Sequence, residues 1–177
     1  MTGIEKAAAI VAALQAAGID LVATLPDAWM TDLIEALAAT PGMTLVRVTR
    51  EDEAVGLCAG AWLGNRRAAV LAQNAGVLLS ANVLAGLAMH HQIPLLVLVA
   101  QRGGIDDDQY YQVYKGRVTA PVLSAIGVPH HAVEGPQHYS RIGEAFRQAT
   151  LGRVPVALLM QRAAFAADPL PATGGAA

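Results

Sequence analysis

Residues 50–60 read Arg50-Glu51-Asp52-Glu53-Ala54-Val55-Gly56-Leu57-Cys58-Ala59-Gly60, and residues 70–76 read Val70-Leu71-Ala72-Gln73-Asn74-Ala75-Gly76. The first run opens with acidic residues and continues with small ones, which indicates a helix with a carboxylate at its N-terminus. The second run is an apolar strand that ends in a Gln-Asn pair. Open α/β sheets bind ligands beyond the carboxyl ends of their strands, so both polar groups occupy ligand-facing positions.

Helix and strand patterns alternate on both sides of these runs. We predict helices at 3–17, 28–39, 51–63, 77–90, 118–126 and 137–150, and strands at 20–25, 44–49, 68–73, 94–100, 129–133 and 154–160. The strands are apolar throughout, as expected when helices cover both faces of a parallel sheet. The sequence therefore predicts a doubly wound α/β domain over residues 1–165, with six mostly parallel strands and helices on both faces. Residues 166–177 are rich in small and turn-forming residues and are predicted to be a disordered tail.

The composition narrows the possible classes of protein. The chain has 177 residues, 54% of them hydrophobic, and a formal net charge of -2, which suits one well-buried domain. With 12 basic and 14 acidic residues, it lacks the basic surface typical of nucleic-acid or membrane binding. The apolar run 75–100 could be mistaken for a membrane span, but His90-His91-Gln92 and Pro94 interrupt it, whereas a span needs about 20 consecutive apolar residues. We therefore read it as a buried helix followed by a strand. A single cysteine, Cys58, and no signal-peptide pattern indicate a cytoplasmic protein.

Polar residues that follow the predicted strands should share one edge of the sheet, and residues that precede a strand should lie at the opposite edge. The first group contains Pro26-Asp27, Arg50-Glu51, Gln73-Asn74 and Arg102; the second contains His90 and His91. The acidic run Asp106-Asp107-Asp108 is read as a solvated loop, because metal loops usually place their ligands at alternating positions. Adjacent histidines point in different directions, so neither His90-His91 nor His130-His131 is read as a metal site.

Four segments, in order along the chain, resemble the pyrimidine-binding domain of thiamine diphosphate enzymes, and among these the sulfopyruvate decarboxylase α subunit and phosphonopyruvate decarboxylase. They are residues 18–27, residues 51–60, residues 73–76 with Asn82 and Leu84, and residues 115–123 with 125–129. No single segment is decisive, whereas four in register are fairly specific. The resemblance implies the thiamine diphosphate-binding fold of the pyrimidine-binding type.

The resemblance implies that Glu51 binds the ring nitrogen N1′ of the cofactor's aminopyrimidine. A carboxylate there stabilises the protonated ring and so promotes removal of the proton from the thiazolium C2. Glu53 also begins the helix, but the family spacing between the glutamate and the Ala-Val-Gly sequence selects Glu51. The alternative is that acidic residues here only complement the helix dipole, which is worth about 0.3–1 kcal/mol and is the favoured interpretation for Asp52 and Glu53.

Further roles are expected at the same edge. Pro26, Gln73, Asn74 and Gly76 are expected at the cofactor together with Glu51, and Asp27, Arg102, Tyr110, Lys115 and Arg117 at the substrate. Five of these residues have an alternative role that involves no ligand. Asp27 would serve equally well as a helix N-cap. Gln73 and Asn74 would instead tie down a strand-to-helix turn, and solvated surface charge is the alternative for Arg102 and, slightly favoured, for Lys115.

Two departures from the family pattern bear on function. Leu78-Leu79 stands where the related decarboxylases have Gly-Asn, which makes that part of the edge more apolar. The chain also lacks a Gly-Asp-Gly followed by Asn, the segment by which these enzymes hold Mg²⁺ and the diphosphate. We therefore expect thiamine diphosphate to be shared with a separate diphosphate-binding subunit, which holds the Mg²⁺, in a hetero-oligomer with at least two copies of each chain.

Together these features predict the pyrimidine-binding (α) subunit of a heteromeric thiamine diphosphate-dependent 2-oxo acid decarboxylase, similar to sulfopyruvate decarboxylase. One alternative is a carboligase subunit that acts on a different 2-oxo acid, and Leu78-Leu79 mildly favours such altered chemistry. Another is a catalytically silent binding or regulatory subunit, against which the presence of Glu51 speaks.

Overall fold

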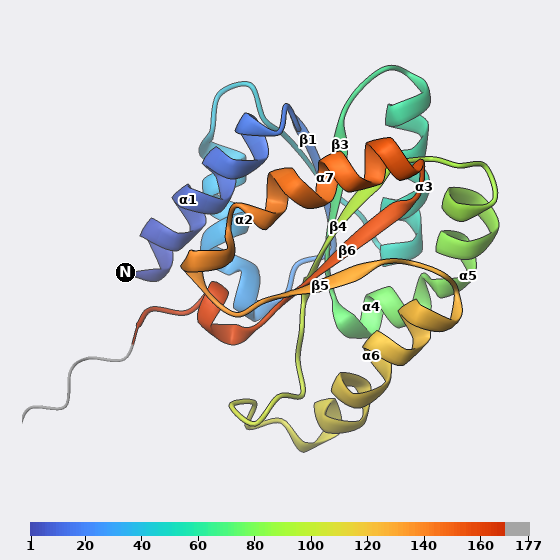
Figure 1. Ribbon diagram of the computed structural model, residues 1–177. Helices are drawn as coiled ribbons and strands as arrows, with labels where there is room; N and C mark the ends of the chain where they lie inside the picture. The colour runs from blue at the N-terminus through green and yellow to red at the C-terminus, as the bar shows by residue number, and fades with distance from the viewer. Residues whose placement is uncertain (169–177) are drawn as a thin grey trace, which may run out of the picture.

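The computed structural model describes residues 1–168, which are built around one six-stranded sheet (Figure 1). The strands are β1 (Leu21–Thr24), β2 (Thr44–Arg47), β3 (Ala68–Gln73), β4 (Leu95–Ala100), β5 (His130–Val133) and β6 (Pro155–Met160). Their order is β2-β1-β3-β4-β6-β5, and every neighbouring pair is parallel. The predicted α/β class is confirmed. The strand order changes direction between β1 and β3, and such a switch point opens a crevice at the carboxyl ends of the two strands.

Helices cover both faces of the sheet (Figure 1). One face carries α1 (Gly3–Ala16), α2 (Thr31–Ala39) and α7 (Arg141–Gly152); the other carries α3 (Glu51–Leu63), α4 (Asn74–Leu79), α5 (Ala81–Val83), the π-helical turn η2 (Leu84–Met89) and α6 (Val113–Ala125). Short 3-10 turns occur at η1 (Ala28–Met30), η3 (Tyr110–Gln112), η4 (Pro136–His138) and η5 (Arg162–Ala164). The segment between β4 and α6 extends from the carboxyl ends of the strands.

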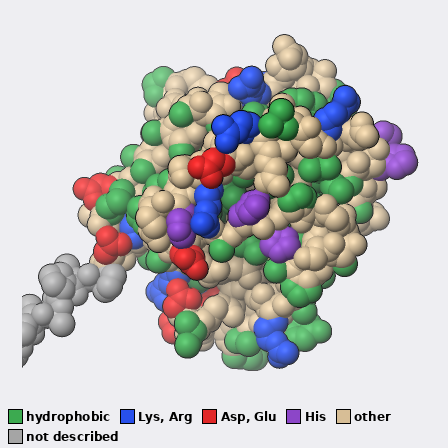
Figure 2. All heavy atoms as spheres, viewed as in Figure 1, with side chains coloured by type: hydrophobic (Ala, Val, Ile, Leu, Met, Phe, Trp, Pro, Cys, Tyr) green, Lys and Arg blue, Asp and Glu red, His purple; other side chains and the backbone are tan. Residues whose placement is uncertain are grey.

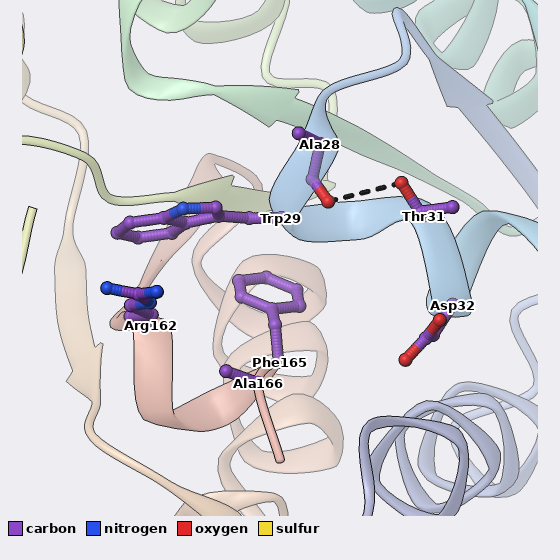
Figure 3. A pocket seen from close by; sticks show the side chains of 7 residues that line it. All are labelled: Ala28, Trp29, Thr31, Asp32, Arg162, Phe165 and Ala166. Carbon is purple, nitrogen blue, oxygen red and sulfur yellow. Dashed lines mark hydrogen bonds between the residues drawn. The ribbon is translucent and has the colours of Figure 1, made fainter. Parts of the chain in front are cut away.

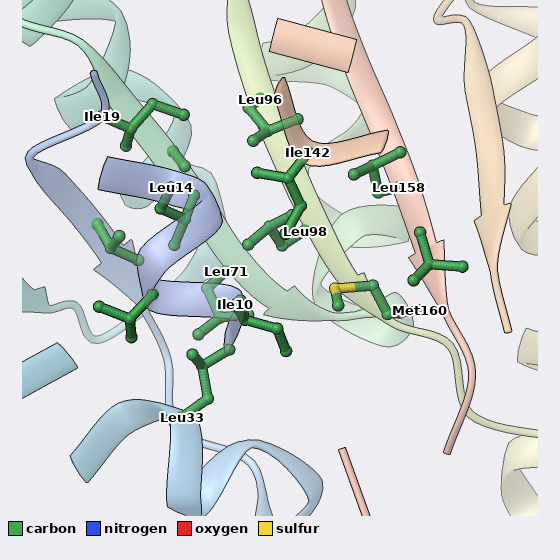
Figure 4. Packing of buried hydrophobic residues seen from close by; sticks show 14 of the residues in the cluster. Ile10, Leu14, Ile19, Leu33, Leu71, Leu96, Leu98, Ile142, Leu158 and Met160 are labelled. Atoms are coloured by element: carbon green, nitrogen blue, oxygen red, sulfur yellow. The ribbon is translucent and has the colours of Figure 1, made fainter. Parts of the chain in front are cut away.

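Alternation along the central strands divides the core into two clusters. On β4, Leu96 and Leu98 pack with residues of α1, α2 and α7, whereas Val97 and Val99 pack with residues of α3, η2 and α6. Figure 4 shows part of the first cluster, with Ile10 and Ile142 facing the sheet. Full burial of such a side chain contributes about 1.5–3 kcal/mol, so the doubly covered sheet explains the continuously apolar strands.

The predicted helix 77–90 is divided into three pieces in the structure. Helix α4 begins three residues earlier, at Asn74, and is followed by α5 and the π-helical turn η2. The division falls at Ser80, whose buried hydroxyl donates a 2.8 Å hydrogen bond to the carbonyl of Gly76. Hydroxyl groups that bond back to the preceding turn bend helices, which accounts for the break. The apolar run that resembled a membrane span is thus a broken helix followed by β4, and no helix within residues 1–168 is long and apolar enough to cross a bilayer.

Helix α6 begins at Val113, five residues before the start of the predicted helix 118–126. The prediction placed the helix start at residue 118, which put Pro121 in the first turn, where proline does not interrupt hydrogen bonding. In the structure Pro121 lies inside the helix. The first turn of α6, before Pro121, contains Gly116. This glycine packs closely on the backbone of Arg102 and Gly103, an approach that a side chain at this position would prevent.

The N-terminal helix is tied to the end of the described chain by one lysine. The Lys6 side chain is buried, and its Nζ donates to the carbonyls of Ala163 at 2.9 Å and Ala166 at 2.7 Å, and also to the Asp168 carboxylate. Ala166 and Asp168, which belong to the predicted tail, thus contact α1. Residues 169–177 of the predicted tail lie outside the described residues.

We expect Lys6→Met to lower the free energy of unfolding by about 1.5–3 kcal/mol, because Met fills the same space but cannot donate to the carbonyls of Ala163 and Ala166. Equilibrium unfolding in urea measures the loss. Asp168→Asn is the comparison, since it keeps both carbonyl acceptors of Lys6 and removes the carboxylate charge that faces Lys6 and the N-terminal amine; it should cost less than Lys6→Met. Equal stability of Lys6→Met and the parent would show that the lysine does not hold the two ends together.

Charged side chains of both signs are scattered over the face shown in Figure 2 and do not form a single basic patch. This distribution agrees with the near-balanced charge of the sequence.

Candidate active site

The polar residues predicted to share one edge of the sheet do so. Asp27 follows β1, Gln73 ends β3, and Arg102 follows β4 at the same ends of the parallel strands. A 2.6 Å hydrogen bond from Gln73 Nε2 to Asp27 Oδ2 crosses from β3 to β1, at the switch point of the sheet. The structure therefore places these residues where α/β sheets bind ligands.

Glu51 is the first residue of α3, and its half-buried side chain lies against Gly76 of α4. A Cβ at position 76 would stand 2.2 Å from Glu51 Cγ and Cδ and 2.3 Å from Oε1, so a side chain here would force the Glu51 carboxylate out of this position. Within residues 1–168 no side chain or backbone N–H forms a hydrogen bond or ion pair with the Glu51 carboxylate. The arrangement provides a carboxylate that lies against α4 and remains available to a ligand.

The neighbouring acidic residues are occupied locally. Glu53 Oε2 caps the start of α3 by accepting hydrogen bonds from the backbone N–H groups of Thr49 at 3.1 Å and Arg50 at 3.2 Å and from the Thr49 hydroxyl at 2.9 Å. Asp52 accepts two bonds from the Arg50 guanidinium, at 3.0 and 2.9 Å. The hydrogen bonds from Arg50 and Thr49 lower the pKa values of Asp52 and Glu53, respectively. Asp52 and Glu53 thus have local hydrogen-bond partners, which distinguishes them from Glu51.

Asp27 is bonded through both carboxylate oxygens. Its Oδ1 accepts a 3.0 Å bond from the backbone N–H of Trp29, which caps the turn η1, and its Oδ2 accepts the bond from Gln73. Gln73 Oε1 in turn accepts a 3.4 Å bond from Gln112 Nε2. The N-cap alternative for Asp27 is therefore present in the structure, and its oxygens also orient the Gln73 amide.

Arg102 is engaged with two carboxylates and one aromatic ring. Its Nε and Nη2 donate to the Asp107 carboxylate at 2.7 and 3.0 Å. Its Nη1 lies 3.6 Å from Asp27 Oδ2, and its guanidinium carbon lies 4.3 Å from the centre of the Trp29 ring. The Asp107 side chain is only 1% exposed, so the expectation of a solvated acidic loop was wrong for this residue. Its burial depends on a partner that lies in a fold-back of the chain, which local sequence does not reveal.

The Arg102 guanidinium holds the pKa of Asp107 well below its usual range, chiefly by hydrogen bonding. A carboxyl whose pKa is lowered in the folded state adds stability above its unfolded pKa, which is about 3.9. That stability is lost only as the pH falls through the lowered value. The Arg102–Asp107 pair is therefore charged at neutral and mildly acidic pH.

Asn74 connects three elements in the interior. Its Nδ2 donates to the Arg102 carbonyl at 3.1 Å and to the Thr119 hydroxyl at 3.3 Å, which joins α4 to the segment after β4 and to α6. Within the described residues, its buried Oδ1 accepts no hydrogen bond, and the same is true of Gln112 Oε1. Sequence reasoning missed Gln112 and Asp107, because neither belongs to a periodic pattern or a recognised motif.

The other predicted residues are more dispersed. Pro26 lines an open cavity of about 460 Å³ together with Asp27 and Arg47. The Lys115 ammonium lies 5.4 Å from the ring centre of Tyr111, and Tyr110 is 87% exposed. Arg117 makes no ion pair within residues 1–168. Their predicted substrate contacts remain predictions.

A smaller cavity, of about 190 Å³, lies beside the switch point (Figure 3). Its lining consists of Ala28, Trp29, Thr31, Asp32, Arg162, Phe165 and Ala166. The Trp29 indole extends over Arg162, whose guanidinium lies 5.9 Å from the ring centre. No group of three or more potential ligands that could hold a metal ion occurs in the described part of the chain.

Comparison with known proteins identifies the family. Residues 4–135 match the family described as thiamine pyrophosphate enzyme, N-terminal TPP binding domain. The chain therefore belongs to this family of thiamine pyrophosphate-binding domains. The predicted resemblance is confirmed, and the family description agrees with thiamine diphosphate as the cofactor.

Individual proteins of known name are similar to this chain in sequence. Sulfopyruvate decarboxylase subunit alpha of Methanococcus maripaludis is 30% identical over 153 residues, which are 86% of this chain and 92% of that protein. The subunit of the same name from Methanothermobacter thermautotrophicus is 33% identical over 133 residues, which are 75% of this chain and 81% of that protein. Phosphonopyruvate decarboxylase of Streptomyces viridochromogenes is 29% identical over 171 residues, which are 94% of this chain but 43% of that protein.

A solved structure supports the fold. The 2-oxoglutarate:ferredoxin oxidoreductase of Magnetococcus marinus matches with a TM-score of 0.71 and 19% sequence identity. The match covers 93% of this chain and 29% of that one. At this level of identity the likeness shows a shared fold and nothing about substrate.

Proposed function

We propose that this chain is the pyrimidine-binding (α) subunit of a cytoplasmic, heteromeric thiamine diphosphate-dependent 2-oxo acid decarboxylase, similar to sulfopyruvate decarboxylase. The observation that carries the proposal is the Glu51 carboxylate, which packs on Gly76 and has no bonding partner in the described chain. The relatives named sulfopyruvate decarboxylase subunit alpha support the choice of reaction.

The residues present fit the pyrimidine end of the cofactor. Bound thiamine diphosphate supplies an electron sink for loss of carbon dioxide from a 2-oxo acid. Glu51 would hold the ring nitrogen of the aminopyrimidine and stabilise its protonated form. Gly76 contributes by its lack of a side chain, which lets the carboxylate lie over the start of α4.

A partner subunit would complete the site. This chain lacks the Gly-Asp-Gly segment, and residues 1–168 contain no cluster of metal ligands, so the diphosphate and Mg²⁺ would be held by a diphosphate-binding subunit. The surface also favours a partner, because several large apolar side chains near the strand ends are exposed. They are Ile105, Tyr110, Tyr111, Val113 and Tyr114. The assembly would contain at least two copies of each chain.

A carboligase subunit is the second candidate. Leu79 is exposed at the end of α4, where the related decarboxylases have a polar asparagine, so this edge offers an apolar surface. Product analysis separates the two reactions, since a carboligase converts a 2-oxo acid and an aldehyde into a hydroxyketone and carbon dioxide, whereas a decarboxylase converts the 2-oxo acid into an aldehyde and carbon dioxide.

The test of the proposed function is calorimetric titration of thiamine diphosphate with Mg²⁺ into the purified chain and into the complex obtained by co-expression with a diphosphate-binding subunit. We expect the complex to bind at least about tenfold more tightly, a difference of about 1.4 kcal/mol, and to release carbon dioxide from sulfopyruvate. Tight Mg²⁺-dependent binding and decarboxylation by the isolated chain would contradict the split-site proposal.

A further inference from the structure

The segment 103–112 extends beyond the strand ends (Figure 1), and one buried carboxylate fixes its base. Besides the two bonds from Arg102, Asp107 accepts a 2.9 Å bond from the backbone N–H of Gly103 and a 3.1 Å bond from that of Gln109. Four donors thus converge on the Asp107 side chain, from residues before and after it. A carboxylate bonded in this way determines the path of the segment.

Trp29 supports the same segment from the other side of the switch point. Two guanidinium groups lie near its ring: that of Arg102, which follows β4, and that of Arg162, which follows β6. Arg162 also donates a 2.8 Å bond to the carbonyl of Asp106. Together, these side chains and Asp107 connect segment 103–112 to the ends of three strands, β1, β4 and β6.

The segment ends at the polar residues of the candidate active site. Gln112 is only 3% exposed and donates to Gln73, which donates to Asp27. The Arg102 guanidinium approaches the same Asp27 oxygen at 3.6 Å. Asp27 and Gln73 are therefore oriented from both ends of the segment.

We propose that Asp107 is a positioning residue of the active site. It acts through Arg102, which it holds so that the base of segment 103–112 stays fixed at the strand ends and Asp27 and Gln73 keep their mutual orientation. This inference rests on the proposed function, because it assigns the orientation of these side chains a role in turnover.

The charges argue against the other use of Arg102, as an anchor for an anionic group of the substrate. One guanidinium is shared between Asp107 and Asp27, so the three side chains carry a net charge of -1. An anionic substrate would have to compete with two carboxylates already in place. Arg102 is moreover only 10% exposed, and its ring contact with Trp29 covers part of the guanidinium.

Replacing Asp107 by Asn preserves the size of the side chain and removes its charge. The guanidinium then has Asp27 as its nearest remaining carboxylate, and a move toward it would disturb the Gln73–Asp27 hydrogen bond and the stack on Trp29. Misplacement of active-site groups by about 1 Å can cost about 10²-fold in rate. We expect kcat to fall about 10- to 100-fold, with little change in KM.

The experiment uses the Trp62→Phe background, in which Trp29 is the only tryptophan of the chain. Asp107→Asn is compared with Asp108→Asn, which removes an adjacent exposed charge. Emission of the full chain reports the environment of Trp29, and kcat and KM are measured in the assembled complex with a monoanionic and a dianionic 2-oxo acid. Asp107→Asn should shift the emission to the red and lower kcat for both substrates, whereas Asp108→Asn should change neither.

Unchanged emission and unchanged kcat in Asp107→Asn would overturn the proposal. If the thermal midpoint of unfolding alone fell, the role of Asp107 would be purely structural, and the proposal would be overturned as well. A rise in KM confined to the dianionic substrate would also overturn it, in favour of Arg102 as an anion anchor. If both the unsubstituted complex and the Trp62→Phe complex were inactive, the result would instead count against the proposed function. The emission comparison then decides by itself whether Asp107 holds the segment.

Discussion

Glu51→Gln should lower decarboxylation by at least about 10²–10⁴-fold, the usual contribution of a positioned acid or base. Gln is similar in size and keeps a hydrogen-bonding oxygen, but it lacks the charge that favours a protonated pyrimidine ring. The fold should be unaffected, because the Glu51 carboxylate bonds to no other group within residues 1–168. The measurements are the decarboxylation rate and the exchange of the cofactor's C2 proton in the assembled complex.

Glu53→Gln is the matched control. Glu53 stands two residues further along α3, and its carboxylate caps the start of the helix. We expect its loss to reduce stability while C2 proton exchange continues. Near-normal exchange in Glu51→Gln would refute the role assigned to Glu51.

Gly76→Ala should reduce activity by about 10²-fold. The added Cβ would lie 2.2 Å from two carbon atoms of Glu51, whereas carbon atoms in contact are about 3.5–4.0 Å apart. The carboxylate must therefore move by more than about 1 Å, a displacement large enough for this loss of rate. Overpacking costs at most about 1–3 kcal/mol of stability, and it costs less here if the Glu51 side chain moves away from the added methyl group. Decarboxylation kinetics and urea unfolding measure the two effects.

Gly143→Ala provides the comparison, because a Cβ at this position in α7 meets no atom within 4 Å. It should be neutral or should stabilise the fold by about 0.4–1 kcal/mol. In the double variant Glu51→Ala/Gly76→Ala the clashing atoms are gone, so stability should recover while activity stays low. Full activity of Gly76→Ala would show that the contact does not position Glu51.

The strands were predictable because their signal is local. Helices cover both faces of β4 and β6, so nearly every residue is apolar, and the predicted ranges differ from the observed ones by one residue at their starts. Helix α3 was predicted with the observed bounds, since its acidic start and the glycine after Leu63 are both in the sequence. The break of the predicted helix 77–90 was missed, because it depends on a side-chain bond from Ser80.

The candidate site was predictable only in part. The strand-end rule placed Asp27 and Gln73 at one edge, since it needs only the order of the elements. The burial of Asp107 was missed because it depends on Arg102 and on a fold-back of the chain. The contact between Glu51 and Gly76 joins residues of two different helices, so sequence patterns suggested both residues without showing that they touch.

The edges of the sheet bear on how this chain associates. The outermost strands, β2 and β5, are only four residues long, and β5 carries two histidines. Short edge strands offer few unpaired backbone groups to which another chain could add a strand. Lateral growth of the sheet into aggregates is therefore disfavoured.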